Sequence, residues 1–258
     1  MATTRRAFLG FIGSLALPAC RRGSQGSPSP AAGRAEPALR VLFIGNSYTY
    51  VNDLPGRLVA LAAASGLASI VVDSVVRGGA RLEAHLSATG AVEKIRGGGF
   101  THVVLQGQSE EPLFDPRAFE SAAATLAAEA NKASAKVIFY ETWARRAGDA
   151  DYQKPWSGGT PAAMQARLTA EYARVAAAAG AIVAPAGRAW ERSLSESPSR
   201  DLFQPDGSHP SVLGTHLVAS VFFGLLTALS PTKLPEGGLE VPPEDARSLH
   251  ATAGRVLG

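Results

Sequence analysis

Between residues 40 and 229 the chain alternates between short apolar runs and longer stretches with helical periodicity. A short, nearly continuous apolar run that ends at Gly or a polar residue is typical of a parallel strand buried on both faces. Alternation of such strands with helices predicts a three-layer α/β/α sandwich whose parallel sheet has about five strands. The strands are expected at residues 40–45, 70–76, 102–105, 136–140 and 181–184.

Capping residues and helix-ending residues mark the predicted helices. Asp53-Leu54-Pro55 predicts a helix start, because Asp caps well and Pro suits the first turn, and Gly66 predicts its end. Thr160-Pro161 predicts the start of another helix, which should reach Ala179. Further helices are expected at residues 82–96, 116–133, 187–195, 211–229 and 244–256.

Residues 1–20 have the features of an export signal. Thr4–Leu9 contains Arg5-Arg6 and resembles the twin-arginine pattern. The apolar stretch that follows, Ala7–Ala19, is too short for a membrane span of roughly 20 residues. It ends in Leu17-Pro18-Ala19-Cys20, which resembles a bacterial lipobox with Cys20 as the acylated residue. We therefore expect an exported protein, periplasmic or on the cell surface, that contacts the membrane only through a lipid at Cys20. Simple cleavage of the signal, or an uncleaved anchor helix, are the alternatives.

Composition limits the remaining possibilities. Residues 21–37 are rich in Gly, Ser, Pro and Ala and are expected to form a flexible linker before one domain at 38–258. The net charge of +3 comes from scattered arginines, without a basic run interleaved with aromatics, so we expect no nucleic-acid partner. One cysteine excludes an intramolecular disulfide. No His, Asp or Glu cluster has metal-ligand spacing, so we expect neither a metal nor another cofactor.

Polar residues with chemical potential follow the predicted strands. In a parallel α/β sheet, the residues just after the strands meet at one edge, where ligands bind. Four such groups stand out along the chain: Gly45-Asn46-Ser47-Tyr48, Gly78-Gly79, Gln106-Gly107-Gln108-Ser109, and Asp206-Gly207-Ser208-His209-Pro210 before the last long helix.

These groups resemble the motifs of the SGNH (GDSL-like) hydrolases, in the family's order. Gly45-Asn46-Ser47 stands where that family has Gly-Asp-Ser, and Asp206-x-x-His209 matches its late Asp-x-x-His. Within the family, a branch long without assigned function carries Gly-Asn-Ser-(Phe/Tyr)-Thr, Val-Val-Leu-Gln-x-Gln-Ser and Asp-Gly-x-His-Pro-Ser, found here at Gly45–Thr49, Val103–Ser109 and Asp206–Ser211. The resemblance implies the flavodoxin-like SGNH fold, with Ser47 as nucleophile, His209 as base and Asp206 as its orienting carboxylate.

Physical chemistry supports these roles. A serine needs a base within hydrogen-bond reach, and imidazole titrates near neutral pH. A carboxylate three residues earlier can hold the imidazole tautomer. An oxyanion can be bound by the N–H of Ser47, a glycine N–H and a side-chain amide. We favour Gly79 over Gly78 for the glycine. The family's usual Gly-x-Asn-Asp is absent, so we favour Gln106, with Gln108 second, for the amide.

The resemblance indicates a function as well as a site. Gln106-Gly107-x-Ser109 is similar to the Gln-Gly-Glu-Ser of carbohydrate acetylesterases with this fold, so hydrolysis of small acyl esters, above all O-acetyl groups on carbohydrates, is expected. Asn46, Gly78, Gln108 and Trp143 are candidates for substrate binding, although Trp143 suits a core position equally well. The alternatives are a lipase or thioesterase of the same fold, and a catalytically silent glycan-binding lipoprotein.

Overall fold

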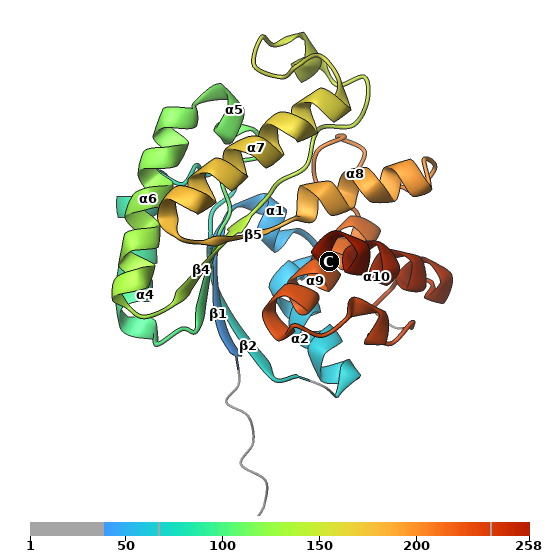
Figure 1. The fold of residues 1–258 in the computed structure, drawn as a ribbon, viewed down its shortest axis with the longest axis horizontal. Coiled ribbons are helices and arrows are strands. Elements are labelled where there is room, and N and C mark those ends of the chain that lie inside the picture. Colours follow the sequence, from blue (N-terminus) through green and yellow to red (C-terminus); the bar gives the residue numbers. More distant parts are fainter. Residues whose placement is uncertain (1–38, 67, 238) are drawn as a thin grey trace, which may run out of the picture. The chain divides into compact units, whose positions relative to one another are not determined.

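The computed structural model describes residues 39–66, 68–237 and 239–258. Residues 1–38, which include the signal and linker predictions and Cys20, lie outside the described residues. Five parallel strands form one sheet in the order β2-β1-β3-β4-β5 (Figure 1). The strands are β1 (Leu39–Gly45), β2 (Ile70–Val76), β3 (His102–Leu105), β4 (Lys136–Tyr140) and β5 (Ile182–Ala184). The predicted α/β sandwich with five parallel strands is therefore confirmed.

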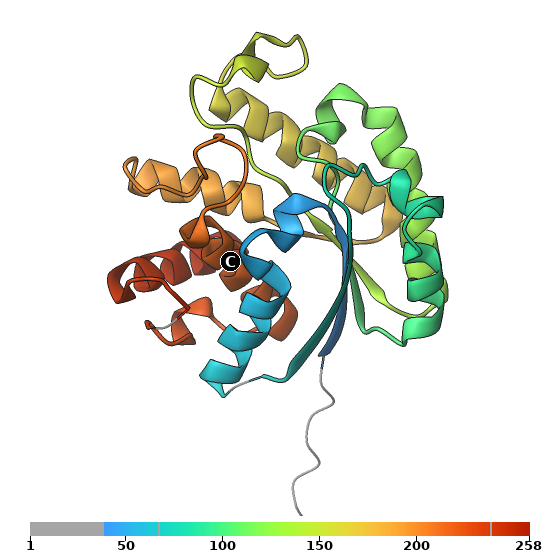
Figure 2. The ribbon, with the colours of Figure 1, turned by 180° about the vertical axis from the view of Figure 1, so that it is seen from behind.

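Helices cover the sheet on both faces, as the two opposite views show (Figures 1 and 2). The α-helices are α1 (Ser47–Tyr50), α2 (Leu54–Ser65), α3 (Ala84–Ser87), α4 (Ala91–Gly98), α5 (Glu111–Phe114), α6 (Pro116–Lys132), α7 (Pro161–Ala179), α8 (Ala186–Glu196), α9 (Val212–Thr227) and α10 (Pro243–Leu257). Short 3₁₀ turns η1 (Val51–Asp53), η2 (Ala150–Gln153) and η3 (Pro231–Lys233) join some of them. Among the described helices, none is long and apolar enough to cross a membrane.

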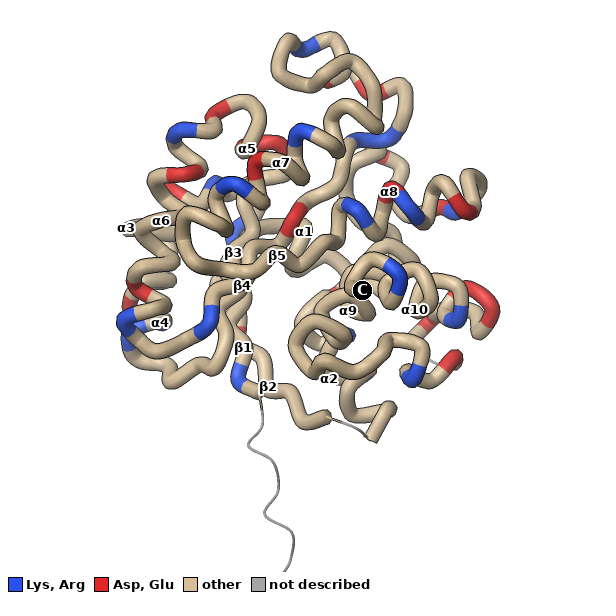
Figure 3. Tube along the Cα trace, in the orientation of Figure 1, with Lys and Arg blue, Asp and Glu red and all other residues tan. Residues whose placement is uncertain are grey.

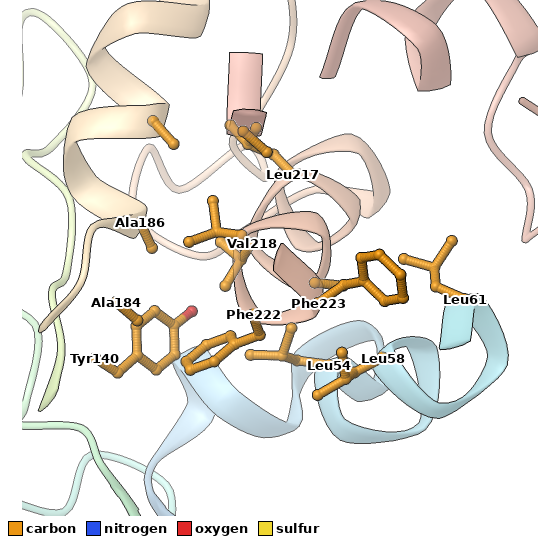
Figure 4. Close-up of a cluster of buried hydrophobic side chains, with 14 of the residues drawn as sticks. Leu54, Leu58, Leu61, Tyr140, Ala184, Ala186, Leu217, Val218, Phe222 and Phe223 are labelled. Carbon is orange, nitrogen blue, oxygen red and sulfur yellow. The ribbon is translucent and has the colours of Figure 1, made fainter. Parts of the chain in front are cut away.

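The core divides into two layers because strand side chains alternate between the faces of the sheet. In β1, Val41 and Phe43 pack under α2, α8, α9 and α10, whereas Leu42 and Ile44 pack under α4, α6 and α7. Figure 4 shows the first layer, in which Phe222 of α9 lies between Tyr140 and the leucines of α2. The Phe222 ring meets Tyr140 edge-on at a centroid distance of 5.2 Å. Burial on both faces explains the continuous apolar runs of the central strands β1, β3 and β4.

Local capping chemistry sets the helix ends. Asp53 accepts a hydrogen bond from the N–H of Gly56 and caps α2, which ends at Gly66 with a φ of 63°. Thr160 caps α7 in the same way through Ala163. The single helix predicted at 82–96 is instead two helices, α3 and α4, separated by Gly90 with a φ of 74°. Lys, Arg, Asp and Glu positions are interspersed over the helices and loops (Figure 3).

Candidate active site

The predicted nucleophile lies at the turn between β1 and α1. Ser47 is the first residue of α1, and the Asn46 side chain caps this helix by accepting from the Tyr48 N–H at 3.0 Å. Gly45 is required just before the turn, because a Cβ there would lie 2.4 Å from Gln106 Oε1. The turn therefore lifts the Ser47 side chain out of the carboxyl edge of the sheet.

The predicted base and its carboxylate lie on one tight loop before α9. Asp206 Oδ1 accepts hydrogen bonds from the N–H groups of Ser208 and His209, both at 3.0 Å. Gly207 between them has a φ of 69°, which glycine adopts without strain. The N–H of Gln204 closes the loop by donating to the His209 carbonyl at 2.7 Å.

The structure brings Ser47, His209 and Asp206 together. His209 Nε2 lies 2.8 Å from Ser47 Oγ, and His209 Nδ1 is hydrogen-bonded to Asp206 Oδ2. Partial burial raises the pKa of Asp206, but the bonds from the His209 ring and from the two backbone N–H groups outweigh it, so the net pKa is lowered. An ionised carboxylate thus fixes the ring with Nδ1 protonated and leaves Nε2 free to accept the serine proton.

A stack of aromatic rings supports this loop from below. Trp143 lies between Tyr48 and Trp190, with centroid distances of 4.5 Å and 4.0 Å. Its indole Nε1 donates to the Ser208 carbonyl at 3.0 Å, and Tyr48 OH bonds Ser208 Oγ at 2.7 Å. Burial raises the pKa of Tyr48 to about 12, so its phenol stays neutral. Of the two positions that the sequence leaves open for Trp143, the structure shows the core: the residue is 1% exposed and does not line the pocket, so its candidacy for substrate binding is not supported.

Two backbone donors of the predicted oxyanion hole have no hydrogen-bond partner in the described part of the chain. Gly79, with a φ of 67°, lies in a turn closed by the bond from the Ala80 N–H to the Arg77 carbonyl. Among the described residues, no acceptor takes the N–H of Ser47 or that of Gly79. Both residues line one pocket with His209, as does Gly78. This arrangement suits the binding of a developing oxyanion.

Gln106 does not line this pocket, so the prediction that it donates to an oxyanion is wrong. Its side chain is fully buried beneath the nucleophile turn. Oε1 accepts from the Asn46 N–H and from Thr49 Oγ1, both at 2.9 Å, and Nε2 donates to Asn46 Oδ1 at 2.9 Å and to the Gly107 carbonyl. Every polar group of the amide is thus used to hold the turn that carries Ser47.

The other two predicted amides differ in their availability. Asn46 borders the pocket but is 2% exposed, and its Nδ2 donates to the Ala80 carbonyl at 3.1 Å, which links the nucleophile turn to the Gly79 turn. Gln108 is half-buried and lines the pocket, and its Oε1 accepts from the Glu110 N–H at 3.3 Å. Gln108, the second choice for the oxyanion-hole amide, is therefore the glutamine that lines the pocket.

Sequence reasoning assigned no role to several residues of the pocket. Ser109, Ser208 and Arg145 line it, the last from the loop after β4, where the strand-end rule would have found it. Glu111 lies behind the wall, fully buried, where its Oε2 accepts from the N–H groups of Leu82 and Gln108. Burial raises the pKa of Glu111, although these two backbone bonds oppose the shift.

The pocket is small and polar. Its volume is about 380 Å³, and it is lined by Asn46, Ser47, Tyr48, Tyr50, Gly78, Gly79, Gln108, Ser109, Arg145, Asp206, Ser208 and His209. None of these described residues has an aliphatic side chain.

A second cavity, of about 840 Å³, lies between α7, α8 and the loop before His209, and Arg145 lines both cavities. Within the described part of the chain, no group of three or more His, Cys, Asp or Glu residues could hold a metal.

Comparisons with known proteins identify the family. No family model and no curated protein matches the chain. Among solved structures, a protein from Slackia heliotrinireducens that is assigned to the SGNH hydrolases is 31% identical, with 73% of this chain and 99% of the other covered and a TM-score of 0.63. A DUF4886 family protein from Bacteroides uniformis is 18% identical, covers 85% and 95%, and has a TM-score of 0.71. A mutant of an acetylxylan esterase from Geobacillus stearothermophilus is 16% identical, covers 71% and 92%, and has a TM-score of 0.56.

The fold and the serine–histidine–aspartate arrangement define the class of SGNH-type hydrolases. At 31% identity over most of both chains, the likeness goes beyond shared fold. The chain belongs to the SGNH hydrolase superfamily.

Proposed function

We propose that this protein is a serine esterase that removes short acyl groups, above all acetyl groups, from carbohydrates. The observation that carries the proposal is the hydrogen-bonded row from Ser47 Oγ through the His209 ring to Asp206. A fold alone supports many functions, whereas such a row next to two backbone N–H groups that no described residue engages favours acyl transfer.

Each side chain has a defined part in the proposed reaction. Ser47 Oγ attacks the acyl carbon while His209 Nε2 takes its proton, and the N–H groups of Ser47 and Gly79 bind the oxyanion. His209 then gives the proton to the departing alcohol, which leaves an acyl ester on Ser47. Water attacks this ester, His209 takes the water proton, and the released serine oxygen regains it as the acid departs.

The lining of the pocket favours a short acyl group and a polar alcohol. An acyl chain of many methylenes gains about 0.8 kcal/mol for each one buried in an apolar channel, and the described lining offers no aliphatic side chain for it. The likeness to an acetylxylan esterase supports the same substrate class. A lipase or thioesterase is the alternative, favoured by the likeness in fold to a lipase/acylhydrolase from Enterococcus faecalis.

Kinetics with a panel of p-nitrophenyl esters tests the proposal. We expect kcat/KM to be highest for acetate and to fall as the acyl chain lengthens, and Ser47→Ala to abolish hydrolysis. A maximum at eight or more carbons would instead identify a lipase or thioesterase. Screening acetylated sugars then tests the carbohydrate part.

A fluorophosphonate probe distinguishes an esterase from a silent glycan-binding protein. We expect covalent labelling of the wild type and none of Ser47→Ala. An unlabelled wild-type protein that also leaves p-nitrophenyl acetate intact would favour the binding protein.

We also propose that the protein is exported and attached to a membrane by a lipid on Cys20. The proposal rests on the twin-arginine and lipobox-like sequence of residues 4–20. Cells given labelled palmitate should label the wild type and a Ser24→Ala control but not Cys20→Ala. Equal labelling of Cys20→Ala would refute acylation at this site.

A further inference from the structure

Arg145 is held in the wall of the catalytic pocket by a paired carboxylate. Its side chain is 16% exposed and that of Glu110 only 5%. Nε donates to Glu110 Oε1 at 2.8 Å and Nη2 to Glu110 Oε2 at 2.9 Å. The hydroxyl of Tyr152 donates to the backbone carbonyl of Arg145. A two-point pair of this kind fixes the plane of the guanidinium.

One edge of this fixed guanidinium remains unused. Nη2 makes a further contact of 3.4 Å with Ser109 Oγ, but no described residue accepts a hydrogen bond from Nη1. Nη1 is not buried, so solvent reaches it. An arginine whose side chain is already fixed by such a pair loses little further side-chain entropy when it binds a ligand oxygen.

The charges around Arg145 favour an uncharged ligand. Glu110 balances the guanidinium charge, and the carboxylate of Asp151 lies 3.8 Å from Nη2. Asp206, whose pKa is lowered, adds a further negative charge to the pocket. A ligand carboxylate would meet this negative surplus, whereas a hydroxyl or ether oxygen would gain the bond from Nη1 without that repulsion.

We propose that Arg145 is a specificity-determining residue that binds, through Nη1, an oxygen atom of an uncharged, oxygen-rich alcohol in the ester substrate. The inference rests on the proposed esterase function and narrows its substrate class to esters of neutral sugars. Arg145 also lines the larger neighbouring cavity, so an alcohol bound at its free edge has room beyond the catalytic pocket.

Matched substrates test the choice between neutral and acidic alcohols. The probes are an acetylated methyl xyloside, the corresponding acetylated glucuronic acid derivative, which differs by a carboxylate on the ring, and p-nitrophenyl acetate. The wild type should prefer the xyloside to the acidic sugar. In Arg145→Met, kcat/KM for the xyloside relative to p-nitrophenyl acetate should fall about 10- to 100-fold, the effect of losing one hydrogen bond from a charged donor.

A second variant tests the charge balance without removing the arginine. Glu110→Gln removes the negative charge paired with the guanidinium, so the preference should shift at least tenfold toward the acidic sugar, and the shift should weaken with added salt. Purely structural damage would lower hydrolysis of both sugars equally. Arg145→Met leaves the Glu110 carboxylate buried and unpaired, which is strongly destabilising. If Arg145→Met does not fold, Glu110→Gln still tests the proposal.

Arg174→Met is the matched control, because Arg174 also pairs with two carboxylates but lies on α7 away from the pocket. Its substrate ratios should equal those of the wild type. A wild type that prefers the acidic sugar, or unchanged ratios in both Arg145→Met and Glu110→Gln, would overturn the role of Arg145 while leaving the esterase proposal intact. A wild type that hydrolyses none of the three esters would overturn the esterase proposal itself.

Discussion

Replacing Gln106 with Ala tests whether its amide supports the nucleophile turn or binds substrate. The substitution removes the acceptor for two buried donors, the Asn46 N–H and the Thr49 hydroxyl. Each buried donor left unpaired costs about 1–3 kcal/mol, so the loss should be about 2–6 kcal/mol before any cavity term. That is a large part of the 5–15 kcal/mol that is typical of a domain.

Urea unfolding together with steady-state kinetics measures both consequences. We expect Gln106→Ala to unfold at a clearly lower urea concentration, and kcat for p-nitrophenyl acetate to fall because Ser47 loses its fixed position. Gln108→Ala is the matched control: Gln108 lines the pocket and is half-buried, so its loss should change stability by less than about 0.5 kcal/mol. If Gln106→Ala were as stable as the wild type while kcat fell about 100-fold or more, Gln106 would act on the oxyanion and our assignment would be refuted.

Three further predictions concern the carboxylates and the turn. Asp206→Asn should lower kcat about 10⁴-fold with little effect on KM, because the wrong imidazole tautomer of His209 would be favoured; a loss below tenfold in steady-state kinetics would contradict this role. Burial raises the pKa of Glu141 to about 7. Between about pH 4.5 and pH 7 this carboxyl is therefore protonated in the folded state but ionised in the unfolded chain. The free energy of unfolding should therefore fall as the pH rises from about 4.5 to 7. Glu141→Gln should remove up to about 3 kcal/mol of this fall, measured by urea unfolding at pH 5 and pH 8, and an equal fall in both proteins would refute the assignment. Gly45→Ala should lower both kcat and the unfolding midpoint, since its Cβ would lie 2.4 Å from Gln106 Oε1, and unchanged values would show that the turn tolerates a side chain.

The strands were predictable to within a residue because each is a compact apolar run, and the central strands β1, β3 and β4 are largely buried on both faces. Such burial leaves continuous apolar runs, as in Val103–Leu105, that polar residues end sharply. The helix break at Gly90 and the short α5 were not predicted, because a four-residue helix has too little periodicity to be recognised. Loops next to such short helices are equally hard to delimit from the sequence.

The site was predictable where chemistry restricts the residue type. Ser47 is far in sequence from Asp206 and His209, yet the structure places its hydroxyl within hydrogen-bond reach of the His209 ring. The choice between Gln106 and Gln108 failed because both follow β3 and look alike in sequence. Strand alternation could not have separated them, because residues 106 and 108 are both in phase with Val104. What differs is the distance from the strand end: Gln106 directly follows β3 and is fully buried, whereas Gln108 lies two residues further on and lines the pocket.

The aromatic stack beneath His209 also affects how the protein can open. A surface loop often detaches at small free-energy cost while the rest of a domain stays folded. Here Trp143 bonds the Ser208 carbonyl while its ring is packed between Tyr48 and Trp190, so freeing the loop would expose indole surface to water. During thermal or urea denaturation, loss of hydrolysis and loss of tertiary packing should therefore occur in one cooperative transition.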